Sequence, residues 1–135
     1  MDFPYPLTTV GALVVNPQGE VLIVKTTKWR GTWGVPGGKV DYGESLEAAL
    51  IREFQEEVGL TLSQIEFAVL QEAIDDPQFC RPAHFVLVNY FARTDETTVI
   101  PNEEIVEWCW LPPEEALTYP LNTFTVSLVK QFQRR

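Results

Sequence analysis

Residues 38–60 read GKVDYGESLEAALIREFQEEVGL, and the rest of the chain is best interpreted outward from this stretch. Between Ser45 and Val58 it holds strong helix formers and neither Gly nor Pro. Ser is a preferred N-cap residue, and Gly59 stands where a left-handed C-cap belongs. The pattern therefore predicts a helix over 45–58.

The predicted helix has one acidic face and one apolar face. Glu53, Glu56 and Glu57 fall within an arc of about 100°, because residues three and four apart are neighbours on a helix. Leu50 and Phe54 begin an adjacent apolar stripe that can pack on a sheet. Carboxylates this close repel one another unless a cation lies between them, and oxygen ligands suit Mg²⁺ and Mn²⁺. The face predicts a divalent metal site, with an ordinary solvated helix face as the alternative.

The spacing of the whole stretch carries a family resemblance. It resembles the Nudix box at every signature position, with the pattern Gly38-x5-Glu44-x7-Arg52-Glu53-Phe54-x-Glu56-Glu57-x-Gly59-Leu60. The resemblance implies a Nudix hydrolase, a pyrophosphohydrolase that uses a divalent metal to split a nucleoside diphosphate linked to another group.

The same resemblance implies roles within the box. Glu56 and Glu57 would be the main ligands of Mg²⁺, with Mn²⁺ as a substitute, and Glu53 a further ligand or the general base. Arg52 would orient these glutamates, and Glu44 would brace the turn into the helix.

Two further metal contacts are implied outside the helix. The backbone carbonyl of Gly37 or Gly38 would complete the metal site. The stretch Glu104-Ile105-Val106-Glu107-Trp108-Cys109-Trp110 resembles a family segment whose first glutamate is a ligand or the general base. Glu104 is therefore favoured over Glu103, with Glu53 as the alternative base.

Candidate substrate contacts lie on both sides of the box. Asn122 precedes a predicted C-terminal helix and reads either as an N-cap or, by resemblance to MutT-type nucleoside triphosphatases, as a base-reading residue. Aromatic rings can stack a base or pack in the core, and the candidates are Trp29, Trp33 and Phe79.

Positive charge gathers near the box. The basic residues within or just before it are Lys25, Lys28, Arg30, Lys39 and Arg52. Lys39 and, further on, Arg81 are candidates for phosphate contacts or for simple surface positions. His84 begins an apolar segment, and a structural role is expected for it.

Element by element, the chain reads as a mixed fold. A hairpin is expected from 8–15 and 20–26, a loop over 27–34, and a short strand and turn over 39–43. Further strands are expected over 61–73, 83–93 and 105–111, with a short helix from 112 and a final helix over 122–133. This order predicts an α/β (α+β) sandwich, and the resemblance implies an α/β/α sandwich with a mixed central sheet.

Composition limits the class of protein. A length of 135 residues suits one domain over 1–135. A net charge of −9 disfavours polymeric nucleic acid but not a small nucleotide. The first ten residues resemble no leader and no apolar run is long enough to span a membrane, which favours the cytoplasm. Cys80 and Cys109 are expected to be free thiols.

Several functions remain open. A (d)NTP, oxidised forms included, is the favoured substrate. ADP-ribose or a nucleotide sugar is the alternative, because Pro77 lies seventeen residues beyond Leu60, close to a spacing typical of ADP-ribose enzymes. The other class is a non-catalytic nucleotide-binding module. Many small family members pair as homodimers, so a homodimer also remains open.

Overall fold

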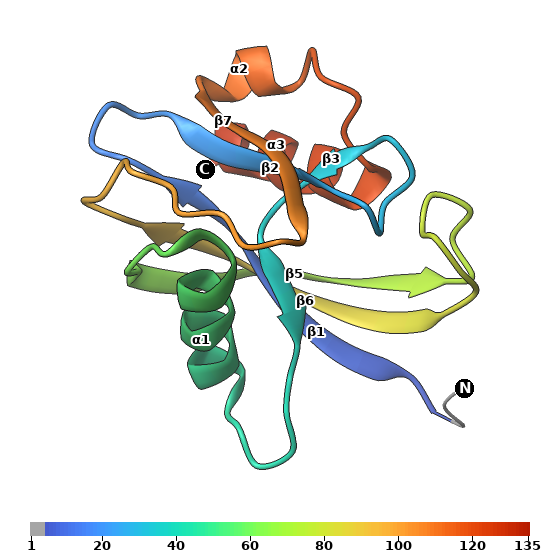
Figure 1. The fold of residues 1–135 in the computed structure, drawn as a ribbon. Coiled ribbons are helices and arrows are strands. Elements are labelled where there is room, and N and C mark those ends of the chain that lie inside the picture. Colours follow the sequence, from blue (N-terminus) through green and yellow to red (C-terminus); the bar gives the residue numbers. More distant parts are fainter. Residues whose placement is uncertain (1–4) are drawn as a thin grey trace.

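The structure is a computed structural model that describes residues 5–135 of the chain. The first four residues, part of the N-terminal segment considered above, lie outside the described range. Seven strands and three helices follow one another: β1 (Leu7–Val15), β2 (Val21–Thr26), β3 (Trp33–Gly34), β4 (Gly37–Lys39), α1 (Leu46–Val58), β5 (Ser63–Ile74), β6 (His84–Arg93), β7 (Ile105–Leu111), α2 (Pro113–Ala116) and α3 (Thr123–Arg134) (Figure 1).

The strands form one mixed sheet. Its main path runs β3-β2-β1-β6-β5, with β4 paired to β1 and β7 paired to β2. β1 and β6 are parallel in register from Leu7↔Phe85 to Val15↔Arg93, and all other pairs are antiparallel. The expected mixed central sheet is confirmed.

The core lies in two layers because side chains alternate along β1. Val10, Ala12 and Val14 pack with the apolar stripe of α1. Leu13 and Val15 pack with α3 and α2 in a second cluster. Helices on both sides of a sheet make the expected sandwich.

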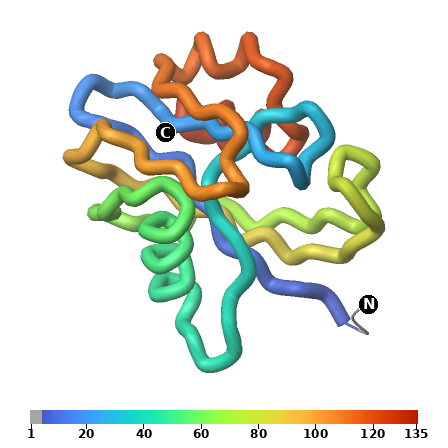
Figure 2. The backbone as a smooth tube through the Cα atoms, viewed as in Figure 1, coloured from blue at the N-terminus to red at the C-terminus, as the bar shows by residue number. Residues whose placement is uncertain are grey.

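Helix α1 begins and ends as its sequence predicts. The Ser45 hydroxyl accepts a hydrogen bond from the Ala48 N–H at 3.1 Å. Gly59 has a φ of 67° and donates its N–H to the Phe54 carbonyl. Figure 2 shows the chain between β4 and α1 as a long loop that projects from the molecule before α1 returns to the sheet.

Two short strands differ from expectation. The segment expected as a loop over 27–34 contains β3, which pairs with β2, and the expected strand at 39–43 lies earlier, in β4. Pattern rules missed β4 because glycine has a low strand propensity. Gly37 is needed there for space, since a Cβ atom would lie 2.1 Å from the Val10 carbonyl oxygen.

Both cysteines are free thiols, as expected, with Cys80 exposed and Cys109 partly buried. Among residues 5–135, no helix is both long and apolar enough to cross a membrane.

Candidate functional site

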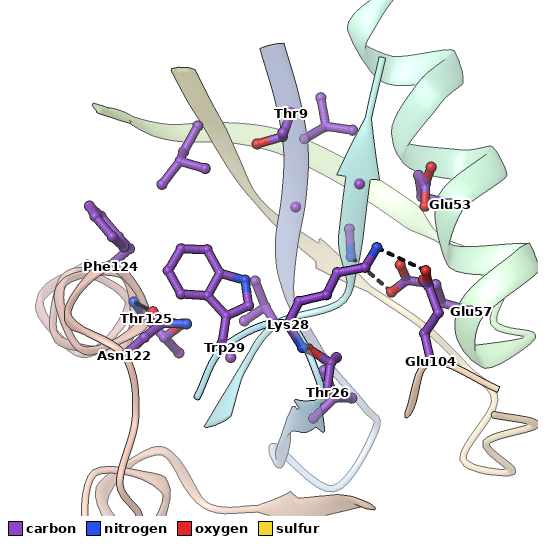
Figure 3. A pocket seen from close by; sticks show the side chains of 18 of the residues that line it. Thr9, Thr26, Lys28, Trp29, Glu53, Glu57, Glu104, Asn122, Phe124 and Thr125 are labelled. Carbon is purple, nitrogen blue, oxygen red and sulfur yellow. Dashed lines mark hydrogen bonds and ion pairs between the residues drawn. The ribbon is translucent and has the colours of Figure 1, made fainter. Parts of the chain in front are cut away.

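A pocket of about 490 Å³ opens between α1, the sheet and the start of α3. Figure 3 shows that its lining divides into two ends. The carboxylate end carries acidic side chains and two lysines: Glu53, Glu56, Glu57, Glu103, Glu104, Lys28 and Lys39. The aromatic end carries rings and side-chain amides: Trp29, Phe79, Phe85, Phe124, Asn89 and Asn122.

The three box glutamates differ in exposure although they share one helix face. Glu57 is 7% exposed, and one of its oxygens accepts a hydrogen bond from the Gly37 N–H at 3.2 Å. The Glu53 side chain is 13% exposed, whereas that of Glu56 is 57% exposed. The carboxylates of Glu53 and Glu57 therefore lie beneath the β4 segment, whereas that of Glu56 lies at the rim of the pocket.

Glycine at position 38 lets the Glu53 carboxylate lie against the backbone. A Cβ atom on Gly38 would lie 2.4 Å from a Glu53 oxygen, so any larger residue would displace that carboxylate. The structure therefore requires glycine at position 38 for space, and the role of its carbonyl as a metal ligand stays a prediction.

Arg52 ties the carboxylates to the loop before α1. Its Nε and Nη2 donate to the two Glu44 oxygens at 2.7 and 2.8 Å, a bidentate pair. Its Nη1 donates to Glu53 at 2.9 Å and to Glu56 at 3.2 Å. Its Nη2 also reaches the Lys39 carbonyl at 3.1 Å. One guanidinium therefore fixes two box glutamates relative to β4.

The environment separates the acidities of these groups. The hydrogen bond from Arg52 lowers the pKa of Glu44 to about 2. Burial raises the pKa of Glu53, against the effect of Arg52. Burial, with the charges of Glu53 and Glu104 added, raises the pKa of Glu57 to about 8 although the Gly37 N–H opposes this. Burial and the neighbouring negative charges therefore favour the protonated form of Glu57 when no cation is bound.

Glu104 comes to the pocket from the loop before β7. It forms an ion pair with Lys28 at 2.8 Å, which Figure 3 shows across the carboxylate end. The loop is held on α1 by the Asn102 N–H, which donates to the Glu57 backbone carbonyl at 2.9 Å. Glu103 also lines the pocket.

The carboxylate end has the donor chemistry of a hard divalent cation. It offers only oxygen ligands, and within the described residues no cationic side chain forms an ion pair with the buried Glu57 carboxyl. Within residues 5–135, however, no three His, Cys, Asp or Glu side chains stand close enough to hold a metal ion as placed. Arg52 forms an ion pair with Glu56, and Lys28 forms one with Glu104. Both glutamates would have to turn inward to bind a metal ion.

The aromatic end corrects one sequence expectation. Trp33 does not line the pocket: it is 8% exposed and packs edge-on against Tyr119 at 5.2 Å in the α3-side core. Its place in β3 turns it away. Trp29 lines the pocket instead, with ring contacts to Phe79 at 4.9 Å and Phe124 at 6.0 Å.

For Asn122 the N-cap interpretation is confirmed, and the base-reading interpretation stays a prediction. It caps α3 through its Oδ1, which accepts from the Thr125 N–H at 2.9 Å, and it also lines the pocket. Lys39 lines the pocket too. Arg81 does not: it is exposed, with its guanidinium 5.7 Å from the Phe79 ring centre.

Sequence reasoning missed Asn89 and Phe124. Asn89 interrupts an otherwise apolar strand (HFVLVNYFAR), and such a lone amide is the signal that could have identified it. Phe124 resembles any apolar residue of an amphipathic helix and offered no signal.

The comparisons with known proteins agree with this geometry. The family model described as "NUDIX domain" matches residues 6–132. The chain is 28% identical over 127 residues to the nucleoside triphosphatase NudI of Escherichia coli K12, covering 87% of this chain and 90% of the relative. It is 30% identical over 115 residues to Nudix hydrolase 5 of Arabidopsis thaliana, covering 82% of this chain but only 38% of the plant protein.

Solved structures are similar over nearly the whole chain. A MutT NUDIX hydrolase from Burkholderia pseudomallei superposes with a TM-score of 0.80 at 29% identity, covering 94% of this chain and 98% of that one. The NUDIX domain of Shewanella oneidensis NrtR, solved with ADP-ribose, gives a TM-score of 0.80 at 27% identity, covering 98% and 90%. These findings confirm the resemblance, the fold and the class of Nudix-type pyrophosphohydrolase predicted from the box.

Proposed function

The chain belongs to the NUDIX family, and from that membership we propose that it hydrolyses a (d)NTP to the monophosphate and pyrophosphate with Mg²⁺. The observation that carries this proposal is the two-ended pocket, with oxygen ligands at one end and aromatic rings with amides at the other. Its volume of about 490 Å³ suits a small molecule.

We propose that Glu53, Glu56 and Glu57 hold the metal, with Glu104 and the Gly38 carbonyl as further ligands. Nudix hydrolases generally need a divalent metal. When bound, Mg²⁺ would polarise the phosphoryl oxygens and neutralise charge on the leaving phosphate. The buried carboxylate of Glu57 supports this assignment, because a cation would remove the penalty of its charge.

The remaining side chains of this end have positioning and proton-transfer roles in the proposal. Arg52 orients Glu53 and Glu56 through the contacts described above. Glu53 or Glu104 accepts the proton of the attacking water, and both line the pocket. Lys28 and Lys39 offer ammonium groups to phosphate oxygens.

At the aromatic end, we propose that Trp29 and Phe124 stack the base. Both rings line the pocket, and stacking on aromatic faces accepts any base. Asn122 contacts the base through its Nδ2, because only its Oδ1 takes part in capping α3. Trp33 has no part in this proposal, since its ring lies in the core.

ADP-ribose is the second candidate substrate. The NrtR domain, which is similar over 98% of this chain, was solved with ADP-ribose. A nucleotide sugar or a non-catalytic binding role are further outcomes that the same experiment distinguishes.

We further propose that residues 1–135 form a single NUDIX domain that acts in the cytoplasm on a small nucleotide. The family match over 6–132 and the net charge of −9 support a small nucleotide over polymeric nucleic acid. A homodimer is proposed by family resemblance alone, and sedimentation of the purified protein would test it.

The test is a substrate panel with and without Mg²⁺. It covers unmodified and oxidised (d)NTPs, ADP-ribose, nucleotide sugars and dinucleoside polyphosphates, with coupled assays that separate pyrophosphate from monophosphate. Mg²⁺-dependent turnover of a (d)NTP that falls by orders of magnitude in Glu56→Gln supports the proposal. Turnover of ADP-ribose alone would select the second candidate, and binding without turnover would select the binding module.

A further inference from the structure

Asn89 is a buried amide on β6 that lines the pocket. It is 8% exposed and stands between the apolar residues Val88 and Tyr90. A buried amide is costly unless its polar atoms find partners, so its hydrogen bonds define its use.

Gln71 on β5 fixes which way the Asn89 amide points. The Gln71 Nε2 lies 3.0 Å from the backbone carbonyl of Phe124, which can only accept, so this atom must be the donor nitrogen. The same Nε2 lies 3.0 Å from Asn89, which must therefore present its Oδ1. The Asn89 NH₂ group is left for the other side.

Asn122 is oriented in the same sense by a different set of contacts. The Thr125 N–H and hydroxyl both donate to its Oδ1, at 2.9 and 2.8 Å. Its Nδ2 is turned toward Gly34, where a Cβ atom would lie 2.9 Å away. Figure 3 shows this amide beside Phe124 at the aromatic end.

Both NH₂ groups are open to the pocket. In residues 5–135, neither Nδ2 atom donates a hydrogen bond, and His84 Nε2 is the single side-chain polar atom that is sealed from solvent without a partner. The two Nδ2 atoms are therefore accessible, and the surface that their residues share is the pocket lining.

Two amide donors facing a pocket require acceptors on the ligand. Resting on the proposed function, we propose that Asn89 and Asn122 select nucleobases that carry a keto oxygen at purine C6 or pyrimidine C4. Guanine, thymine and uracil carry such an acceptor, whereas adenine and cytosine carry an amino donor at the same position. An amino group set against an amide NH₂ leaves both without a partner, which strongly disfavours the wrong base. Gln71 is the positioning residue, because without it the Asn89 amide is free to flip.

The test compares dGTP and dTTP with dATP and dCTP. Turnover is measured in the otherwise wild-type protein, and equilibrium binding is measured by calorimetry with Mg²⁺ in a Glu56→Gln background. Keto bases should be favoured by about 5- to 100-fold. Asn89→Asp keeps an oxygen for Gln71 and replaces the NH₂ donor with an acceptor, so it should abolish or reverse the ratio.

The chain offers a matched control for Gln71. Gln131 also ties α3 to β5 by donating its Nε2 to the Ala68 carbonyl at 2.9 Å, whereas only Gln71 of the two donates to Asn89. Gln71→Leu should bring the keto-to-amino ratio toward one, and Gln131→Leu should leave it unchanged.

The outcomes separate this proposal from the proposed function. A keto preference in binding that Asn89→Asp removes supports the base-reading proposal, even if no nucleotide is turned over and the hydrolase assignment fails. Equal binding of the four nucleotides, a preference unmoved by Asn89→Asp, or no nucleotide binding overturns it. Equal effects of the two glutamine variants would also contradict the role of Gln71.

Discussion

The two ends of the pocket are built in different ways. The carboxylate end is built around three glutamates of one helix, α1, with Arg52 linking Glu44, Glu53 and Glu56 by side-chain contacts within a short span of sequence. The aromatic end is assembled from β6, the loop before β3 and the start of α3, with Gln71 of β5 contacting Asn89. This difference teaches that chemistry can be fixed by a local motif while the choice of substrate depends on tertiary packing.

The largest expected effect is on the carboxylate end. Glu57→Gln removes one charge from the proposed metal site and should lower kcat/KM by at least ~100-fold. The factor should be the same for every nucleotide, because Glu57 lies away from the aromatic end (Figure 3). Steady-state kinetics with two nucleotides check this. If Glu57→Gln changed the ratio of kcat/KM between two nucleotides, the two ends of the pocket would not act independently.

Two tryptophans four residues apart test the other end. Trp33→Leu opens the α3-side core and should lower the free energy of unfolding by roughly 2–4 kcal/mol, with little change in nucleotide affinity. Trp29→Leu removes a pocket wall and should weaken nucleotide binding by ~5- to 100-fold with a smaller loss of stability. Urea unfolding and calorimetric titration measure the two quantities. A larger loss of stability in Trp29→Leu together with a larger loss of affinity in Trp33→Leu would contradict the placement of the two rings.

The pH dependence of stability is a third test. The pKa of Glu57 is about 8 in the folded chain and near the ordinary 4.5 when unfolded. The folded state therefore holds the proton more tightly, and the Glu57 contribution to stability falls as pH rises from 4.5 to 8. In EDTA, the free energy of unfolding of Glu57→Gln should rise relative to that of wild type by on the order of 2 kcal/mol between pH 4.5 and 8.

Mg²⁺ provides the control for that experiment. A cation bound at the carboxylate end stabilises the folded state. At pH 8, Mg²⁺ should therefore raise the free energy of unfolding of the wild type more than that of Glu57→Gln. A stability difference between the two proteins that is constant from pH 4.5 to 8 would show that Glu57 is not penalised by burial.

The smallest expected effect concerns the end of α1. Gly59 has a φ of 67°, and a Cβ atom there would lie 3.1 Å from Ile100 Cβ. Gly59→Ala should lower stability by about 1–2 kcal/mol and leave base selectivity unchanged. Gly43→Ala is the matched control, since its φ is 87° but nothing lies within 4 Å of the added atom. Thermal unfolding should show the larger loss for Gly59→Ala, and the reverse order would contradict the crowding at Ile100.

The predictability of the site follows the same division. The helix, its caps and the shared face of Glu53, Glu56 and Glu57 follow from the helical period and were predicted. Their unequal burial was not, because it depends on how β4 lies over α1. The place of Glu104 depends likewise on backbone contacts of its loop with α1.

The aromatic end shows why the rest could not be predicted. Trp29 and Trp33 are equally plausible in sequence, and the pairing of β3 with β2 decides which of them is turned into the core. The contact of Gln71 with Asn89 depends on the β5–β6 register, which shifts at a bulge between Phe67 and Val69. A shift of this kind changes which side chains face one another and has no local signal.

The most direct test of the central claim is Mn²⁺ binding without nucleotide, measured by the loss of the free-ion electron paramagnetic resonance signal at pH 8. Mn²⁺ takes the same oxygen ligands as Mg²⁺, and the measurement does not depend on the identity of the substrate. We predict that the wild-type protein binds Mn²⁺ at least ~10-fold more tightly than Glu57→Gln. Equal Mn²⁺ affinity in the two proteins would contradict the assignment of the carboxylate end as the metal site.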